Sequence, residues 1–212
     1  MIRLAVPGDA SALARLHVEG LPKDLLPRLG FDFLARAFYP LVLSSPYCFT
    51  LVHDQGDGPG GFVVFTHDSP GFMRRLRSRT PAMFLAALAK FSRDPALLAD
   101  LTRCALGFAC DTRSLPCQPE ACPELFVIAM AHERRSAGIG TRLALEGLAR
   151  LARISATARL GCLVKTSSEG AFEFYRKLGF QPVGDERRGA RVLWVLHRSN
   201  VQSPDEGELR IT

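Results

Sequence analysis

The spacing of apolar residues alternates between helix-like and strand-like along most of the chain. Apolar positions about three or four residues apart predict amphipathic helices, whereas alternating or unbroken runs of about four to eight apolar residues predict strands. On this basis the N-terminal third contains a short strand, two helices and a hairpin with a glycine-rich turn. These elements are expected at residues 2–6, 9–19, 31–43, 47–53 and 61–67. Asp9 is expected to be the N-cap of the first helix.

The pattern resumes at residue 124 and continues to residue 197. An unbroken apolar run at residues 125–130 is typical of a strand buried on both faces. It is followed by a glycine-containing turn, a helix with one charged face, a second apolar strand at residues 160–164 and a short helix that ends at Gly179. A closing hairpin is expected, with arms at residues 180–183 and 191–197. Strands that alternate with helices in this way predict an α/β protein.

Residues 70–123 interrupt this alternation. The segment begins with a basic amphipathic stretch, continues with two predicted helices that start near Pro81 and at Asp94-Pro95, and ends in a proline-containing loop. We therefore predict a single domain over residues 1–198, with a helical, basic insertion at residues 70–123 and a polar tail at residues 199–212.

The composition excludes several classes of protein. Of 212 residues, 47% are hydrophobic and 23% are charged, which is typical of a globular chain and not of a disordered or fibrous one. No apolar run reaches the roughly 18 residues of a membrane span, and the N-terminus does not resemble a signal peptide, so we expect a soluble, cytoplasmic protein. Six cysteines in such a chain are expected to be free thiols. The spacing of Cys110, Cys117 and Cys122 does not match a zinc site, and no metal is predicted.

The net charge of +6 is concentrated in two segments. Residues 71–113 carry eight Lys or Arg against three Asp or Glu, and residues 132–177 carry nine against four. Such segments favour anionic ligands or surfaces, although solvated helix faces would give the same pattern. Neither segment contains a nucleic-acid recognition motif, so nucleic acid is not an expected partner.

The turn at residues 135–141 has the form of an anion-binding site. It joins a buried strand to a helix N-terminus, and Gly138 and Gly140 allow a ligand to approach the backbone. It is not a phosphate-binding Walker loop, because no Gly-Lys-Ser/Thr ends it, and Leu143 replaces the third glycine of a dinucleotide fingerprint. Taken alone, the turn is equally compatible with a purely structural role.

A second motif makes the first more specific. Arg135-x-x-Gly138-x-Gly140 is followed about thirty residues later by Ala171-Phe172-Glu173-Phe174-Tyr175-Arg176-Lys177-Leu178-Gly179-Phe180. In this order and at this distance, the two motifs resemble those of the GNAT superfamily of N-acetyltransferases. The resemblance covers about residues 2–67 and 124–197. It implies a mixed, mostly antiparallel twisted sheet with splayed central strands and flanking helices, in which the insertion lies between the third and fourth strands.

The resemblance also implies acetyl-coenzyme A (acetyl-CoA) as cosubstrate. Backbone amides of the turn would hold its pyrophosphate, the pantetheine would lie along the strand near Met130, and an N–H close to Met130 would stabilise the oxyanion. The residues implied in donor binding are Ile128, Ala129, Met130, Arg135, Ser136, Ala137, Gly138, Ile139, Gly140, Thr141, Ser168, Ala171, Phe172 and Tyr175.

Two residues are candidates for proton transfer. Tyr175 is implied as the acid that protonates the leaving thiolate, the alternative being an amphipathic aromatic residue at a helix edge. Glu124 lies six residues before Met130 and matches the catalytic glutamate of histone-type members, the alternative being a strand-end carboxylate in water. Because no cysteine or serine nucleophile is evident beside a base, direct transfer to an amine through a ternary complex is expected.

Several features depart from the family or leave alternatives open. Ser168 stands where many members carry asparagine, and the insertion lies near the side from which acceptors approach. The basic residues of the insertion could dock an acyl carrier protein or a membrane surface, so that the donor would be a long-chain acyl group; these residues are Arg74, Arg75, Arg77 and Arg79. A non-catalytic acyl-CoA sensor is a further alternative. The acceptor, a small molecule or a protein, and a possible homodimer are not settled by the sequence.

Overall fold

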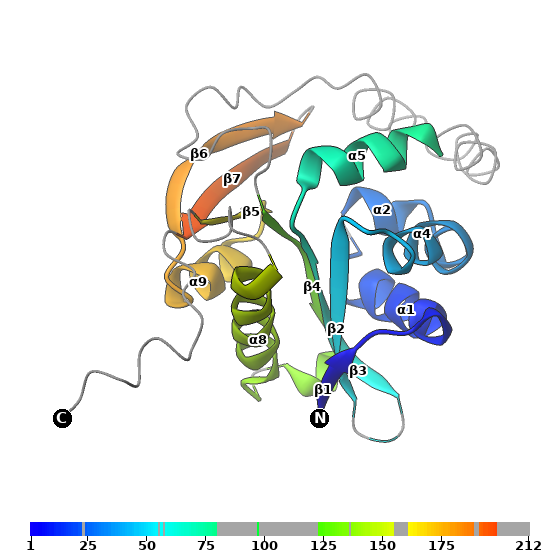
Figure 1. The fold of residues 1–212 in the computed structure, drawn as a ribbon. Coiled ribbons are helices and arrows are strands. Elements are labelled where there is room, and N and C mark those ends of the chain that lie inside the picture. The colour runs from blue at the N-terminus through cyan, green and yellow to red at the C-terminus, as the bar shows by residue number, and fades with distance from the viewer. Residues whose placement is uncertain are drawn as a thin grey trace.

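One mixed sheet of seven strands organises the part of the chain that the computed structural model describes (Figure 1). The described residues are 1–22, 24–54, 56, 58–79, 97, 123–135, 137–154, 161–188 and 191–198. The strand order is β1-β2-β3-β4-β5-β7-β6, and only β4 and β5 run parallel. The strands are β1 Ile2–Leu4, β2 Cys48–Asp54, β3 Pro59–Thr66, β4 Glu124–Met130, β5 Cys162–Thr166, β6 Gln181–Arg188 and β7 Arg191–Arg198.

Helices cover both faces of this sheet (Figure 1). The N-terminal helices and α5 lie on one face, and α8 and α9 lie on the other. None of the described helices combines the length and hydrophobicity needed to cross a lipid bilayer. The helical segments are η1 Pro7–Asp9, α1 Ala10–Gly20, α2 Leu25–Arg28, α3 Phe31–Phe33, η2 Leu34–Phe38, α4 Tyr39–Leu43, α5 Ser69–Ser78, η5 His132–Arg134, α8 Ile139–Ile154 and α9 Glu169–Lys177.

Each face of the sheet carries its own hydrophobic core. Alternate residues of β3 point to opposite faces, so that Phe62 is buried against α1 and Phe65 is buried against α8. The α1 core also encloses a polar pair, in which the Tyr39 hydroxyl lies 2.8 Å from Nδ1 of His17. Burial lowers the pKa of His17 to about 4, so this imidazole is neutral at pH 7 and packs as part of the core.

The parallel strands β4 and β5 are paired only where they begin. Glu124 pairs with Leu163 and Leu125 pairs with Val164, and the register continues no further. On its other side, β4 carries a β-bulge at Phe126, which has no partner between the pairs Val64–Val127 and Phe65–Leu125. The predicted splay of the central strands is therefore confirmed. As predicted, both faces of this strand pack into a hydrophobic core, but burial is incomplete: Ala129 is fully buried on the α1 side and Leu125 on the α8 side, and the other residues of β4 are partly buried.

Most predicted elements are present, and the differences have local causes. Residues 31–43 are helical as predicted but contain the π-turn η2, in which the Tyr39 N–H bonds to the Leu34 carbonyl five residues earlier. The next residue, Pro40, has no N–H to offer the Arg36 carbonyl, so the regular α-helical bonding is interrupted here. The short helix α2, between α1 and α3, was not among the predicted elements. In the last hairpin, β6 extends to Arg188, so most of the turn predicted around residues 185–189 is strand. Of the predicted insertion, the structure describes α5, Leu97 and Pro123; its remainder and the polar tail lie outside the described residues.

Asp9 does not cap α1 with its side chain, contrary to the sequence prediction. Its carboxylate accepts hydrogen bonds from the Val6 N–H at 2.8 Å and from both terminal nitrogens of Arg3 at 2.8 and 3.0 Å. The Arg3 Nε also donates to Asp54 at 2.8 Å, so a single guanidinium joins β1, η1 and the end of β2. The bonds from Arg3 lower the pKa of Asp9.

We expect Asp9→Asn to lower the free energy of unfolding at pH 7 by about 1–2 kcal/mol, because a half-buried guanidinium loses one of its two charged partners. Since the pKa of Asp9 is lowered in the folded state, the advantage of the wild type should be complete above the unfolded pKa of about 4 and disappear as the pH falls through the folded value. Urea denaturation at several pH values measures both effects. Asp32→Asn, which removes an exposed pair with Arg36, is the control and should cost less than about 0.5 kcal/mol.

Candidate active site

The predicted anion-binding turn leads directly into α8. Gly138 has φ of +73°, a left-handed conformation that favours glycine, and its carbonyl accepts a hydrogen bond from the Arg142 N–H at 3.1 Å. The helix begins at Ile139 and is 16 residues long, so its first amides and its dipole point toward the turn. Ala137, Gly138 and Thr141 are exposed, whereas the Ile139 side chain is buried in the α8 core. Ser136 lies outside the described residues.

Three segments that are distant in sequence converge at Gly140. A Cβ atom at this position would lie 3.8 Å from the ring of Phe174 and 4.0 Å from Cδ1 of Ile128. The N-terminus of α8, the strand β4 and the helix α9 therefore meet beside the point where β4 and β5 separate. Partly buried apolar side chains from this region pack against the α8 core: Ile128, Met130, Ala171, Phe172, Phe174 and Trp194.

The edge of β4 on the β5 side has backbone N–H groups without a strand partner. The Ala131 N–H bonds to the Gly60 carbonyl at 3.1 Å, on the β3 side. Because the amides of a strand alternate in direction, those of Ile128 and Met130 face the opposite edge. Among the described residues, Glu124 and Leu125 are the only residues of β4 that pair with β5, so no strand partner meets these two amides. An extended ligand could therefore pair with β4 here, as the sequence analysis expects near Met130.

Tyr175 is buried in the α8 core, where its ring lies 5.2 Å from that of Phe174 and 5.8 Å from that of Phe180. Burial raises the pKa of its hydroxyl, and interactions with Asp24 and Cys162 act in the same direction. The phenol therefore keeps its proton at neutral pH. The effect of Asp24, which precedes α2, was missed by the sequence analysis, because no local pattern links it to a residue of α9.

Glu124 lies on the other side of the sheet from Tyr175. Its neighbour Leu125 belongs to the α8 core, so alternation places the Glu124 side chain on the face covered by α5. There its Oε2 atom accepts a hydrogen bond from Ser69 at 3.3 Å, and the Ser69 oxygen lies 2.5 Å from Oγ1 of Thr66. The structure thus does not bring the two proton-transfer candidates into contact. Ser69 and Thr66 were missed, because no sequence motif joins them to Glu124.

Two other residues predicted to bind the acyl donor form hydrogen bonds within the protein. The Ser168 hydroxyl caps α9 by accepting a hydrogen bond from the Ala171 N–H at 3.5 Å. The Arg135 side chain donates to the Gly20 carbonyl at 3.3 Å and so fastens the turn to the end of α1. A role in donor binding would come in addition to these contacts.

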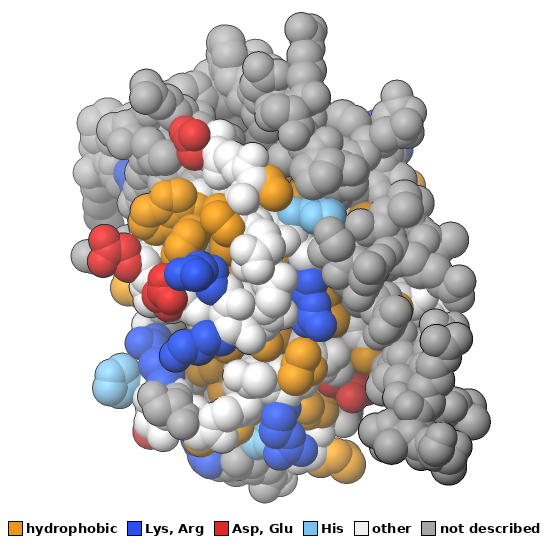
Figure 2. Space-filling view, turned by 90° about the vertical axis from the view of Figure 1, so that its left-hand side faces the viewer, with side chains coloured by type: hydrophobic (Ala, Val, Ile, Leu, Met, Phe, Trp, Pro, Cys, Tyr) orange, Lys and Arg blue, Asp and Glu red, His pale blue; other side chains and the backbone are white. Residues whose placement is uncertain are grey.

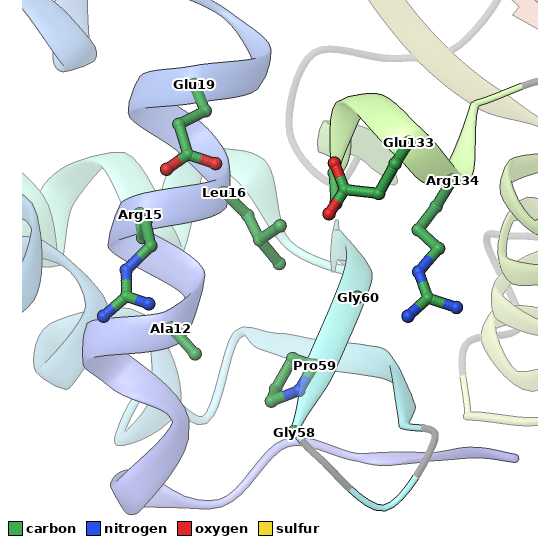
Figure 3. A pocket seen from close by; sticks show the side chains of 10 residues that line it. Ala12, Arg15, Leu16, Glu19, Gly58, Pro59, Gly60, Glu133 and Arg134 are labelled. Atoms are coloured by element: carbon green, nitrogen blue, oxygen red, sulfur yellow. The ribbon is translucent and has the colours of Figure 1, made fainter.

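A pocket of about 280 Å³ lies on the α1 side of the segment that precedes the turn (Figure 3). Residues of α1 form one wall, and Glu133 and Arg134 form the other. None of the predicted donor-binding or catalytic residues lines it. The pocket is lined by Ala12, Arg15, Leu16, Glu19, Gly58, Pro59, Gly60, Ala131, Glu133 and Arg134. It is therefore distinct from the region around Gly140.

Basic side chains border the α8 side of the candidate site. Figure 2 shows Lys and Arg side chains among hydrophobic ones on the lower part of the face that carries α8 and α9. Arg142 and Arg153 of α8 are exposed, and the Arg150 guanidinium lies 5.8 Å from the centre of the Phe49 ring. Of these three, only Arg142 lies in the first turn of α8, where its positive charge suits an anionic ligand; Arg150 and Arg153 lie in the last turns of the helix. Within the described residues, no group of three or more His, Cys, Asp or Glu side chains could hold a metal ion.

A mixed sheet whose two parallel strands separate beside a helix N-terminus defines the acetyltransferase class predicted from the motifs. The sequence profile of the acetyltransferase (GNAT) family matches residues 69–180, just over half of the chain, and the chain belongs to this family. It is therefore an acyltransferase. The match runs across residues 70–123, which the motif resemblance left uncovered.

Solved structures with this fold cover nearly the whole chain. One, from Corynebacterium glutamicum and described as histone acetyltransferase HPA2 and related acetyltransferase, is 17% identical, covers 94% of this chain and 96% of its own, and has a TM-score of 0.58. An acetyltransferase of the GNAT family from Streptococcus pneumoniae is 18% identical, with coverages of 93% and 97% and a TM-score of 0.55. An N-acetyltransferase from Staphylococcus aureus is 17% identical, with coverages of 93% and 99% and a TM-score of 0.54. A search of curated protein sequences found no match.

We expect Gly138→Ala and Gly140→Ala to change stability in opposite directions. Gly138→Ala should lose about 1 kcal/mol, because alanine is disfavoured at a φ of +73° although a Cβ there meets open space. Gly140→Ala should gain up to about 1 kcal/mol, because its Cβ makes only ordinary contacts and alanine is the better helix former. Chemical denaturation of both variants measures the difference. A similar loss in both would show that the backbone around Gly140 differs from the one described.

Proposed function

We propose that this acyltransferase uses acetyl-CoA and transfers its acetyl group directly to a primary amine, on a small molecule or a protein. The observation that carries the proposal is the convergence of α8, β4 and α9 at Gly140, beside two strands that have separated. It supplies helix N-terminal amides for the pyrophosphate of coenzyme A and an open strand edge for its extended pantetheine chain.

In this proposal the donor lies along β4. The amides of the 135–141 turn bind the pyrophosphate, and the pantetheine pairs with the edge that carries the amides of Ile128 and Met130. One of these amides, close to Met130, faces the thioester oxygen and stabilises the negative charge that develops there. The half-buried side chains of Ala171 and Phe172 border the pantetheine from α9.

The reaction removes two protons from the acceptor nitrogen and supplies one to sulfur. Glu124 takes the first proton from the acceptor ammonium, through water where the two do not touch, and the free amine attacks the thioester carbonyl. A carbon–nitrogen bond forms, the nitrogen releases its second proton to water, the oxyanion collapses, and the carbon–sulfur bond breaks. Tyr175 gives its proton to the thiolate and recovers one from solvent. Its raised pKa keeps the phenol protonated throughout the neutral range, as an ordinary tyrosine is, so the proposed role rests on its place in the 171–180 motif and not on this shift.

We expect the wild-type protein to bind acetyl-CoA with micromolar affinity and Gly138→Trp to lose at least about tenfold, because the indole would occupy the space in front of the turn. Isothermal titration calorimetry measures this, and fluorescence of Trp194, the only tryptophan of the wild type, gives a second readout for the wild-type protein. Gly56→Trp is the matched control, because Gly56 also has a positive φ and open space at its Cβ. Equal losses in both variants would remove the turn from the donor site, and no binding to the wild type would refute acetyl-CoA as donor.

We expect Tyr175→Phe to lower kcat by about 100-fold while the KM for acetyl-CoA changes little, because the phenol acts on the leaving thiolate. Release of the coenzyme A thiol in a screen of primary amines measures turnover. Because burial raises the pKa of Tyr175, wild-type kcat should not fall up to about pH 10 through loss of this proton. Tyr47→Phe, in a half-buried tyrosine at the start of β2, is the control. A Tyr175→Phe enzyme with unchanged kcat would exclude Tyr175 as the acid.

A further inference from the structure

We propose that Ser69, the first residue of α5, is a positioning residue that holds the Glu124 carboxylate in place for proton removal, and that Thr66 fixes the Ser69 hydroxyl. This inference rests on the proposed function, in which Glu124 is the base. It assigns a catalytic purpose to the start of α5, the segment that follows β3 and covers the Glu124 face of the sheet.

The hydrogen bonds of these three residues have a defined direction. Oε2 of Glu124 lies 3.3 Å from the Ser69 hydroxyl, and an ionised carboxylate only accepts, so Ser69 donates. Its oxygen is then free to accept the proton of Thr66 Oγ1, which lies 2.5 Å away. The alternative acceptor for Thr66, the Glu124 carbonyl, is 3.5 Å away. The geometry favours the chain Thr66 to Ser69 to Glu124.

The backbone holds the three side chains in register. Thr66 and Glu124 are directly paired across β3 and β4, and Thr66 is completely buried. Ser69 follows within three residues, where Asp68 caps the new helix by accepting a hydrogen bond from the Gly71 N–H at 2.7 Å. These contacts leave Ser69 little freedom to turn its hydroxyl away from the carboxylate.

The next turn of α5 is also held against β4. Phe72 is completely buried, and its ring lies 5.4 Å from that of Phe126, the bulged residue of β4. Phe126 in turn stacks on Phe38 of the π-turn at 6.3 Å. The first turn of α5 is thus attached to β4 at Glu124 and again at the bulge, so Ser69 and the carboxylate belong to one packed unit. A helix N-terminus also favours the negative charge of the carboxylate.

We expect Ser69→Ala to lower kcat by about tenfold with an unchanged KM for acetyl-CoA, because a carboxylate without its donor loses the orientation needed for proton removal. Thr66→Val should lower kcat by less, and Ser69→Thr, which keeps the hydroxyl, should restore the wild-type kcat. Ser78→Ala on the exposed part of α5 and Thr50→Val in β2 are matched controls.

The second measurement does not need an acceptor. In protein labelled with ¹³C at the glutamate carboxyls, the Glu124 signal is identified by its loss in Glu124→Gln, and its chemical shift at pH 7 should change in Ser69→Ala but not in Ser69→Thr. An unchanged chemical shift and an unchanged kcat in Ser69→Ala would overturn the proposal. If Glu124→Gln keeps full kcat, the assigned base is wrong and this inference falls with it, whereas the donor site would stand. If Ser69→Ala does not fold, Ser69→Cys, a weaker donor of similar size, carries the same test.

Discussion

The separation of β4 from β5 is the constraint on which the candidate site depends. A sheet gains stability by pairing every strand, yet these parallel neighbours share only two residue pairs. The strand β4 stays in the sheet because β3 pairs with it along its length, with one bulge at Phe126. A backbone amide left unpaired and shielded from water costs about 1–3 kcal/mol. A ligand that pairs with this edge would remove that cost. If β4 and β5 paired along their whole length, no amides would be left free for such a ligand.

The same constraint separates the two proton-transfer groups. Tyr175 lies in the core under α8, and Glu124 lies on the face under α5, so only β4 has access to both. The removal of one proton and the supply of another can then proceed without the two groups exchanging it directly, which agrees with direct transfer to a bound amine.

The sequence predicted those parts of the molecule that depend on neighbouring residues. The strand-turn-helix at Gly138 and Gly140, the cap at Gly179 and the order of the elements all follow from local spacing, and the structure agrees with them. The contacts that surround the candidate catalytic groups do not have such a signal. Ser69 and Glu124 are 55 residues apart, and their hydrogen bond exists only because β3 and β4 pair with Thr66 opposite Glu124. The error at Asp9 has a more local cause, because its carboxylate binds the nearby Val6 N–H and Arg3; only the second partner of Arg3, Asp54, depends on the pairing of β1 with β2.

The attachment of α5 to Glu124 also bears on the acceptor. The helix is bound to β4 through Ser69 at its first residue and through Phe72 one turn later, and both contacts lie on the face from which the proposed base works. A displacement of α5 by an acceptor would therefore move the hydroxyl that orients the carboxylate. In the proposed mechanism, the orientation of the Glu124 carboxylate and the fit of an acceptor on this face are therefore coupled, because the helix that follows β3 supplies a hydrogen-bond donor to the proposed base and packs on the same face of the sheet.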